Sequence, residues 1–330
     1  MAAQGRANRA HRSLAYPGRH NRNNHPFVLF GILSACLTGC VENTTTEGIG
    51  VLVSIVPQAE MIEYIGGEYV DVTIMVPAGQ DPHSFEPTPK QMKKVAEATA
   101  YFKVGSGVEF EVVHMDTILE QNSDLKVFDS SEDISVISFD GHYGQEEHEH
   151  EEDDDHEEEH DDEHDHDGTD PHIWLSPENF KKMAEVVYNG LVEIDPKHQE
   201  EYYTNYQEYI SKLDSLHTNV SNLLQPYEGK SFMVYHPAWG YFGDTYNLKM
   251  IAIEDEGKQP GPGGIDAIIS QAKEENITVI FVAPQFDTSS AETIANEIGG
   301  KVVFANPLMT DYEETITKLA EDMVSGFEQS

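Results

Sequence analysis

The run of residues 146–167 constrains the fold of this chain more than any other feature. It contains only Asp, Glu and His: sixteen acidic side chains and six histidines. Such a run has no apolar surface whose burial could offset the entropy lost on folding, so it can neither build a core nor hold a strand. The folded body must come from the residues on either side. We predict a disordered, acidic and His-rich loop over 142–168.

A run of carboxylates and imidazoles attracts divalent cations. We expect this loop to gather metal loosely, while ordered histidines elsewhere bind it tightly. The histidines of this auxiliary metal-gathering loop are His148, His150, His156, His160, His164 and His166.

Two catalytic or metal-site motifs appear within this loop, and we reject both. Residues 156–160 match the zinc-protease pattern H-E-x-x-H, but that mechanism needs both histidines on a stable helix packed against a core. Residues 163–168 resemble the first half of a calcium loop, but they begin with Glu, and Trp174 stands where the bidentate Glu belongs.

The N-terminus indicates secretion. The only cysteines are Cys36 and Cys40, which excludes a disulfide framework for the folded body. The apolar stretch Phe27–Leu37 follows basic residues and is too short to span a bilayer, as is typical of a secretory leader. It ends in LTGC (37–40), which looks like a lipobox. We predict a signal peptide over 1–39, a lipid anchor at Cys40 on the outer face of the cytoplasmic membrane, and a tether over 40–48. The alternative is a leader cleaved without lipidation.

The net charge of the chain excludes some classes of binding partner. The formal net charge is −40, and all five arginines lie in the first 22 residues, so the chain without its leader is more acidic still. Such a protein repels nucleic acid and anionic lipid, and it concentrates cations. Adaptation to a salty medium would explain the charge outside the acidic run, but it would not explain the histidines inside it.

From residue 51 onward, apolar runs alternate with helical patterns. This alternation predicts α/β structure with parallel sheets covered on both faces. We place an N-terminal α/β lobe at 49–195 and a C-terminal α/β lobe at 228–330. The strands are expected at 51–56, 70–76, 101–104 and 125–128 in the first lobe, and at 231–235, 250–253, 279–283 and 302–305 in the second.

A long helix is predicted between the lobes, in the segment 196–227. Residues 197–224 contain no Gly or Pro, and their apolar side chains recur at steps of three and four. This pattern indicates one helix of about 28 residues, about 40 Å long. We interpret it as a rigid strut that joins the lobes. The alternative is a surface coiled coil.

Three histidines are candidate metal ligands. The tripeptide Asp-Pro-His occurs twice, at 81–83 and 170–172. We place each copy at the end of a β segment and shortly before a helix, so both rings should lie at the same sheet edge. His236 leaves the first strand of the second lobe in the equivalent position. Three neutral imidazoles facing one cleft suit tetrahedral zinc. The histidines within helical patterns are interpreted as structural: His114, His198 and His217.

Three segments together resemble a known family. GQDPHSFEPTP (79–89), TDPHIWLSP (169–177) and VYHPAWGYF (234–242), with an acidic His-rich insert before the second, are similar to the zinc-binding component of zinc ABC transporters. These proteins belong to the manganese/zinc group of solute-binding proteins. The resemblance runs from about residue 51 to 327. It implies two α/β lobes joined by a rigid helix, metal in the interlobe cleft, and docking onto a membrane permease.

The resemblance also assigns ligands. It makes His83, His172 and His236 metal ligands. In the manganese-binding members that the chain resembles, the third ligand position is a carboxylate residue. A histidine at this position therefore favours zinc. Many members carry an acidic residue where this chain has Asn306. The fourth ligand therefore stays open between Asn306, a water molecule and a residue of 254–256.

We predict an extracytoplasmic, monomeric, high-affinity zinc-binding protein that delivers Zn²⁺ to an ABC transporter permease and is not an enzyme. One alternative is a manganese-binding member of the same group. A metal-dependent hydrolase would keep an open coordination position beside a general base, and no motif supplies that base. A surface adhesin or a plain metal buffer is the third alternative.

Overall fold

The computed structural model describes residues 48–137, 168–254 and 258–329. The predicted signal peptide, Cys40, nearly all of the tether and the six histidines of the metal-gathering loop lie outside the described residues. No helix among the described residues is long and apolar enough to cross a bilayer.

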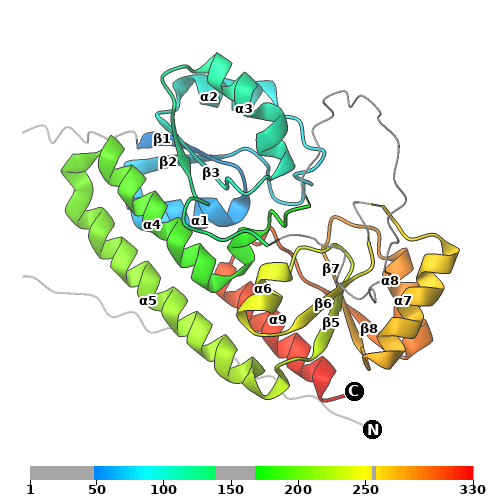
Figure 1. Ribbon diagram of the computed structural model, residues 1–330. Helices are drawn as coiled ribbons and strands as arrows, with labels where there is room; N and C mark the ends of the chain where they lie inside the picture. The colour runs from blue at the N-terminus through cyan, green and yellow to red at the C-terminus, as the bar shows by residue number, and fades with distance from the viewer. Residues whose placement is uncertain (1–47, 138–167, 255–257, 330) are drawn as a thin grey trace, which may run out of the picture. The chain divides into compact units, whose positions relative to one another are not determined.

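The fold contains two four-stranded sheets with parallel pairing throughout, which confirms the predicted α/β class (Figure 1). The strand orders are β2-β1-β3-β4 and β6-β5-β7-β8, so the second sheet repeats the topology of the first. In each sheet the chain starts on an inner strand, moves to one edge and then crosses to the other side. Ligands of such sheets bind beyond the carboxyl ends of the strands. The strands are β1 Ile49–Val53, β2 Val70–Ile74, β3 Ala100–Lys103, β4 Lys126–Asp129, β5 Ser231–Val234, β6 Lys249–Ala252, β7 Val279–Val282 and β8 Lys301–Phe304.

Helices connect these strands and begin at the signals present in the sequence. Thr88 caps α2: its hydroxyl accepts from the backbone N–H of Gln91, whose side chain in turn accepts from the N–H of Thr88. Ser176 caps α4 with its hydroxyl, which accepts from the backbone N–H of Asn179. The helices are α1 Val56–Gly66, α2 Pro89–Glu97, α3 Glu109–Gln121, α4 Pro177–Ile194, α5 Gln199–Leu224, α6 Gly240–Thr245, α7 Pro262–Glu274, α8 Ser289–Ile298 and α9 Tyr312–Phe327.

The predicted connecting helix is α5, with 26 residues. It starts two residues later than expected, because Pro196–His198 form a separate 3-10 turn. The residue before a proline is disfavoured in the helical conformation, which ends α4 at Ile194. Helix α5 packs against α1 and α4 of the N-terminal half and against α9 at the end of the chain. It therefore joins the two sheets, as Figure 1 shows.

The core explains why the two halves stay together. One buried apolar cluster extends from β1 through α5 to α9. In β5, Phe232 and Val234 belong to this cluster, while Met233 points to the other face and joins a smaller cluster under α7 and α8. Side chains of a strand alternate between faces, so β5 is buried on both sides, as expected of a parallel strand.

One expectation about the second Asp-Pro-His copy is wrong. It does not follow a strand of the sheet, because β4 ends at Asp129 and no later strand precedes residue 170 among the described residues. Ile134 and Ile137 contact the core without pairing with β4. Asp170 is tied back by its N–H, which donates to the carbonyl of Ile137 at 2.8 Å.

Candidate metal site

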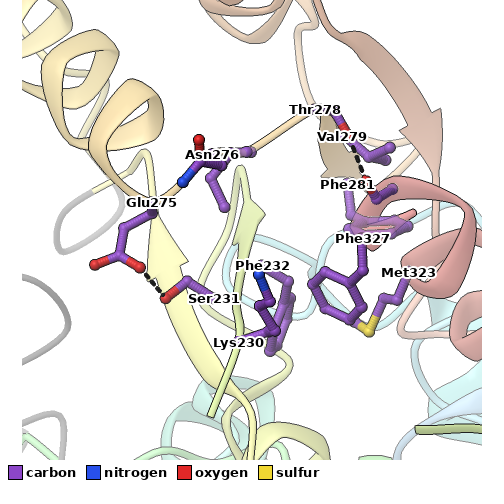
Figure 2. Close-up of a pocket in the computed structure, with 12 residues that line it drawn as sticks. Lys230, Ser231, Phe232, Glu275, Asn276, Thr278, Val279, Phe281, Met323 and Phe327 are labelled. Atoms are coloured by element: carbon purple, nitrogen blue, oxygen red, sulfur yellow. Dashed lines mark hydrogen bonds between the residues drawn. The ribbon is translucent and has the colours of Figure 1, made fainter. Parts of the chain in front are cut away.

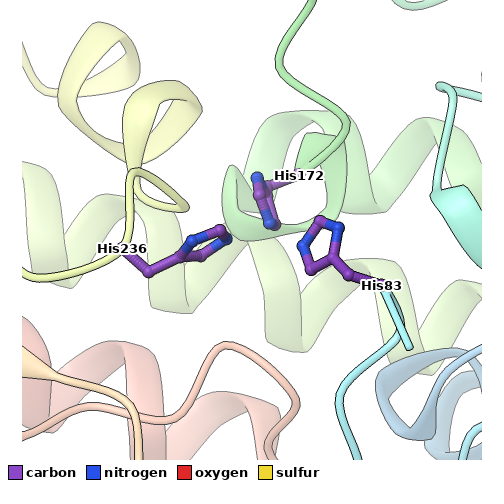
Figure 3. A group of neighbouring side chains, drawn as sticks. All are labelled: His83, His172 and His236. Atoms are coloured by element: carbon purple, nitrogen blue, oxygen red, sulfur yellow. The ribbon is translucent and has the colours of Figure 1, made fainter. Parts of the chain in front are cut away.

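The structure brings the three predicted histidines together. One ring nitrogen each of His83, His172 and His236 lies within 4.8 Å of the others, and this is the cluster of potential ligands found among the described residues (Figure 3). The rings come from three separate segments: the loop after β2, the loop before α4, and the loop after β5. Their role as ligands stays a prediction, and the geometry permits it.

His172 is buried and held by Asp170. The Asp170 carboxylate accepts from the backbone N–H of His172 at 2.9 Å and lies 2.7 Å from its Nδ1. A carboxylate on Nδ1 leaves Nε2 as the ring nitrogen available to a cation. Burial, with a smaller effect of His83, lowers the pKa of His172 to about 3. The ring is therefore neutral at physiological pH, as a metal ligand must be.

Asp170 itself has an unusual environment. Its side chain is completely buried. Burial raises the pKa of Asp170 to about 8, against the opposing effect of the hydrogen bond from the His172 backbone. Without a cation nearby, this carboxyl group therefore holds a proton near neutral pH.

His236 lies beside a second buried carboxylate. Its Nδ1 is 3.5 Å from Oε2 of Glu254, and both side chains are largely buried. The two residues follow the neighbouring strands β5 and β6 at their carboxyl ends. Burial lowers the pKa of His236, although Glu254 opposes the shift. The ring also stacks on Phe286, with 5.0 Å between the ring centroids.

His83 occupies the exposed side of the cluster. Its Nδ1 lies 3.1 Å from Oε2 of Glu109, the first residue of α3, and the two side chains are 38% and 42% exposed. The hydrogen bonds of the Asp81 carboxylate go to groups other than the ring. The carboxylate accepts from the backbone N–H of His83 at 3.1 Å and from the hydroxyl of Ser84 at 3.1 Å.

Each ring thus faces a carboxylate through Nδ1. Sequence reasoning missed the part played by Glu109 and Asp170, and it considered Glu254 only as a possible fourth ligand. The repeated tripeptide was a signal for Asp170, which stands two residues before its histidine. Nothing in the sequence indicated Glu109, which lies 26 residues from its partner.

The amide of Asn306 is hydrogen-bonded within its own loop. Its Oδ1 accepts from the N–H of Leu308 at 3.0 Å, and its Nδ2 donates to the carbonyl of Leu308 at 3.1 Å. Both amide atoms are thus used within its own loop. The pocket around the rings is lined instead by Asp81, Pro82, His83, His172, Trp174, His236, Gln285, Phe286, Pro307 and Leu308.

The segment that carries His172 is anchored to the C-terminal half of the chain. The indole of Trp174 donates to the carbonyl of Pro307 at 2.8 Å, and the hydroxyl of Tyr312 donates to the carbonyl of Trp174 at 2.7 Å. From α6, the hydroxyl of Tyr241 donates to the carbonyl of Asp170 at 3.1 Å. Buried hydrogen bonds of this kind hold His172 in place without any metal.

The histidines interpreted as structural stay outside the cluster. His114 lies against the carbonyl of Phe85 at 3.3 Å, His198 pairs with Asp195, and His217 stacks on Tyr246.

A second pocket lies at the amino ends of β5 and β7, opposite the histidines (Figure 2). Phe232, Met323 and Phe327 contribute its apolar wall, and Ser231 donates to Glu275 at 2.8 Å. None of its lining residues is a histidine or a cysteine. This pocket offers no set of nitrogen or sulfur ligands for a metal.

Comparison with known proteins identifies the family. The family model of the periplasmic component A of the zinc-uptake complex, ZnuA, matches residues 51–326. This chain belongs to that family. The family resemblance found in the sequence is thereby confirmed, and the members are binding components of metal uptake rather than enzymes. The hydrolase alternative is set aside.

Individual relatives leave the metal open. The chain is 30% identical over 308 residues to the high-affinity zinc uptake system protein ZnuA of Bacillus subtilis, covering 90% of this chain and 91% of the relative. It is 28% identical over 296 residues to the manganese-binding lipoprotein MntA of Halalkalibacterium halodurans, covering 86% and 88%. A crystal structure of ZnuA superimposes with a TM-score of 0.74 at 33% identity, covering 84% of this chain and 99% of that chain.

Proposed function

We propose that this protein captures Zn²⁺ between its two lobes, outside the cytoplasm, and delivers it to the permease of an ABC transporter. The observation that carries the proposal is the convergence of three imidazoles, from segments far apart in the chain, to within 4.8 Å. Spacing of this order allows one cation at about 2.0–2.1 Å from each nitrogen after small ring adjustments.

The chemistry of the donors favours zinc over manganese. Imidazole nitrogen suits zinc, whereas carboxylate, carbonyl and water oxygens suit manganese. The nearby carboxylates of Glu109, Asp170 and Glu254 lie against the Nδ1 atoms of the histidines. These carboxylates therefore face the Nδ1 atoms of the rings and leave the Nε2 atoms for the cation. The similarity to a manganese-binding lipoprotein makes manganese the second candidate.

The remaining proposals concern the location and organisation of the protein. Relatives named as lipoproteins support a lipid anchor at Cys40. We place the lobes at 49–195 and 228–330, on either side of the segment 196–227 that contains α5. We propose that the protein acts as a monomer and that the histidines of residues 142–168 raise the local concentration of zinc.

A competition titration of zinc against manganese tests the central proposal. The purified full chain should bind one Zn²⁺ tightly and prefer it to Mn²⁺. His236→Ala should abolish tight binding, whereas the matched control His217→Ala should retain it, because His217 stacks on Tyr246 away from the cluster. Tight zinc binding by His236→Ala, or a preference for manganese, would contradict the proposal.

Deletion of residues 146–167 tests the role of the loop. We expect the deleted protein to keep the tight site and to bind fewer zinc ions in total. Loss of the tight site would show that the two roles had been assigned the wrong way round.

A further inference from the structure

We propose that Asp170 and Glu254 are positioning residues. Their carboxylates lie beside the Nδ1 atoms of His172 and His236 and supply the negative charge that balances a divalent cation bound by these rings. The inference rests on the proposed function, since it concerns how the same three histidines hold their ion. It assigns the affinity of the site partly to two residues that do not touch the metal.

The first observation is the burial of the two carboxylates. The side chains of Asp170 and Glu254 are 0% and 6% exposed. Neither faces a lysine or arginine within ion-pair distance among the described residues; each faces a histidine ring instead. A charge in such a place is screened weakly by solvent and salt, so it interacts strongly with an ion one ring away.

The second observation is a set of buried polar atoms without a hydrogen-bond partner. Oδ2 of Asp170, Oε2 of Glu254 and Nδ1 of His236 all belong to this set within the described part of the chain. Burying an ionisable group without compensation is costly. A divalent cation held by the histidines provides that compensation for both carboxylates.

The third observation is the charge of the ligands themselves. Three neutral imidazoles carry no charge, and the amide of Asn306 is neutral and bonded to Leu308. A bound Zn²⁺ would therefore place two positive charges among neutral ligands. Ionised Asp170 and Glu254 would balance both charges through the rings of His172 and His236. The hydrogen bond to Asp170 fixes Nδ1 of His172 as a donor, and Glu254 lies 3.5 Å from Nδ1 of His236, so in both rings Nε2 is left for the ion.

Glu109 provides an internal contrast. It makes the same type of contact, with His83, but its side chain is 42% exposed. Solvent screens its charge, so its contribution should be small. Burial, rather than the contact alone, should decide which carboxylate matters.

The experiment compares Asp170→Asn and Glu254→Gln with the control Glu109→Gln in the full chain. Each change replaces a carboxyl group by a neutral amide of the same shape, so no negative charge can form there when the ion binds. Zinc affinity is measured by chelator competition. We expect a loss of about 10- to 100-fold for each buried position and of less than about threefold for Glu109→Gln. The absorption spectrum of the Co²⁺-loaded protein should shift for the two buried variants only.

Thermal unfolding of the metal-free variants separates this role from a structural one. In the metal-free protein each of these carboxyl groups faces a histidine ring, so replacing it by a neutral amide of the same shape breaks no ion pair with a lysine or arginine. Asp170→Asn and Glu254→Gln should therefore unfold at the same temperature as the parent or higher. A purely structural role predicts the opposite: a lower unfolding temperature and an unchanged Co²⁺ spectrum. That result would overturn the proposal.

The outcomes also distinguish this inference from the proposed function. If the parent protein binds zinc tightly and both buried variants bind equally tightly, the inference fails while the proposed function stands. If the parent protein itself does not bind zinc tightly, the proposed function is wrong, and the inference, which rests on it, is wrong as well.

Discussion

The two copies of Asp-Pro-His have the same sequence and different structures. In the copy at 81–83, His83 is 38% exposed, and the carboxylate of Asp81 is used by the backbone of the loop and by Ser84. In the copy at 170–172, the His172 side chain is 7% exposed, and Asp170 accepts from its backbone while also contacting its ring. Both copies of the tripeptide thus bring a histidine to the cluster, but the aspartate contacts the histidine ring only in the second copy.

The surroundings of each copy explain the difference. The loop at 81–83 is held by local contacts within the N-terminal half, such as the N–H of Ser84 donating to the carbonyl of Asp81. The segment at 170–172 is held by Ile137 and Ser106 of the N-terminal half and also by Tyr241 of the C-terminal half. Solvent reaches His83 and not His172. We infer that the second copy provides the fixed ligand and the first copy the accessible one.

The largest effect should come from removing the rings. His172→Ala and His83→Ala should each weaken zinc binding by more than about 100-fold, beyond the range for residues behind the ligands. His114→Ala should leave the affinity unchanged, because His114 contacts Phe85 rather than the cluster. Isothermal titration with chelator competition measures all three. Equal affinity in His83→Ala and the parent protein would leave the exposed copy without a role.

The next effect concerns pH. The pKa of Asp170 is about 8, so below that pH a proton must leave its carboxyl group if the bound ion is to face a carboxylate. Zinc affinity should therefore rise with pH between 6 and 8, by up to about tenfold per unit. The burial that lowers the pKa of His172 to about 3 keeps that ring from adding to this slope. Affinities measured at several pH values test the sign and the size.

Two matched variants test whether the pH dependence of zinc affinity comes from the aspartate of the second Asp-Pro-His copy. Asp170→Asn should flatten the profile, whereas Asp81→Asn should keep it, since the Asp81 carboxylate accepts from the His83 backbone and from Ser84 rather than from a ring. A profile equally steep in both variants would show that Asp170 does not exchange the proton.

A smaller effect should appear in stability. In the parent protein the indole N–H of Trp174 donates to the carbonyl of Pro307 at 2.8 Å. Trp174→Phe removes this donor and leaves the carbonyl without it. Loss of a buried hydrogen bond should lower the free energy of unfolding by about 1–3 kcal/mol. Urea denaturation of the metal-free protein measures the change.

The smallest effect belongs to the matching contact of the exposed copy. Ser84→Ala removes a hydrogen bond to Asp81 at the surface, and it should change the free energy of unfolding by less than about 0.5 kcal/mol. If Ser84→Ala destabilised the protein as much as Trp174→Phe, the distinction between a fixed and an accessible copy would be wrong.

Much of the fold was accessible from the sequence because its signals are local. The cap at Thr88, the Ser176-Pro177 start of α4 and the apolar runs of β5 and β7 each act over a few residues. The three histidines were also found, since two share a tripeptide and the third follows an equivalent strand. The placement of the second Asp-Pro-His copy at the end of a β segment was wrong, because β4 ends at Asp129 and the described residues between it and 170 form no strand.

The sequence by itself determined the alternation of strands and helices, the long helix between two sheets, and the three rings to be brought together. Only the tertiary structure decided which carboxylate stands behind each ring, that the amide of Asn306 is engaged by Leu308, and that one copy of the tripeptide is buried. The physical reason is distance along the chain. Burial, and the pKa shifts that follow from it, depend on groups such as Tyr241 and Pro307, which bond to the residues beside His172 from the other half of the protein.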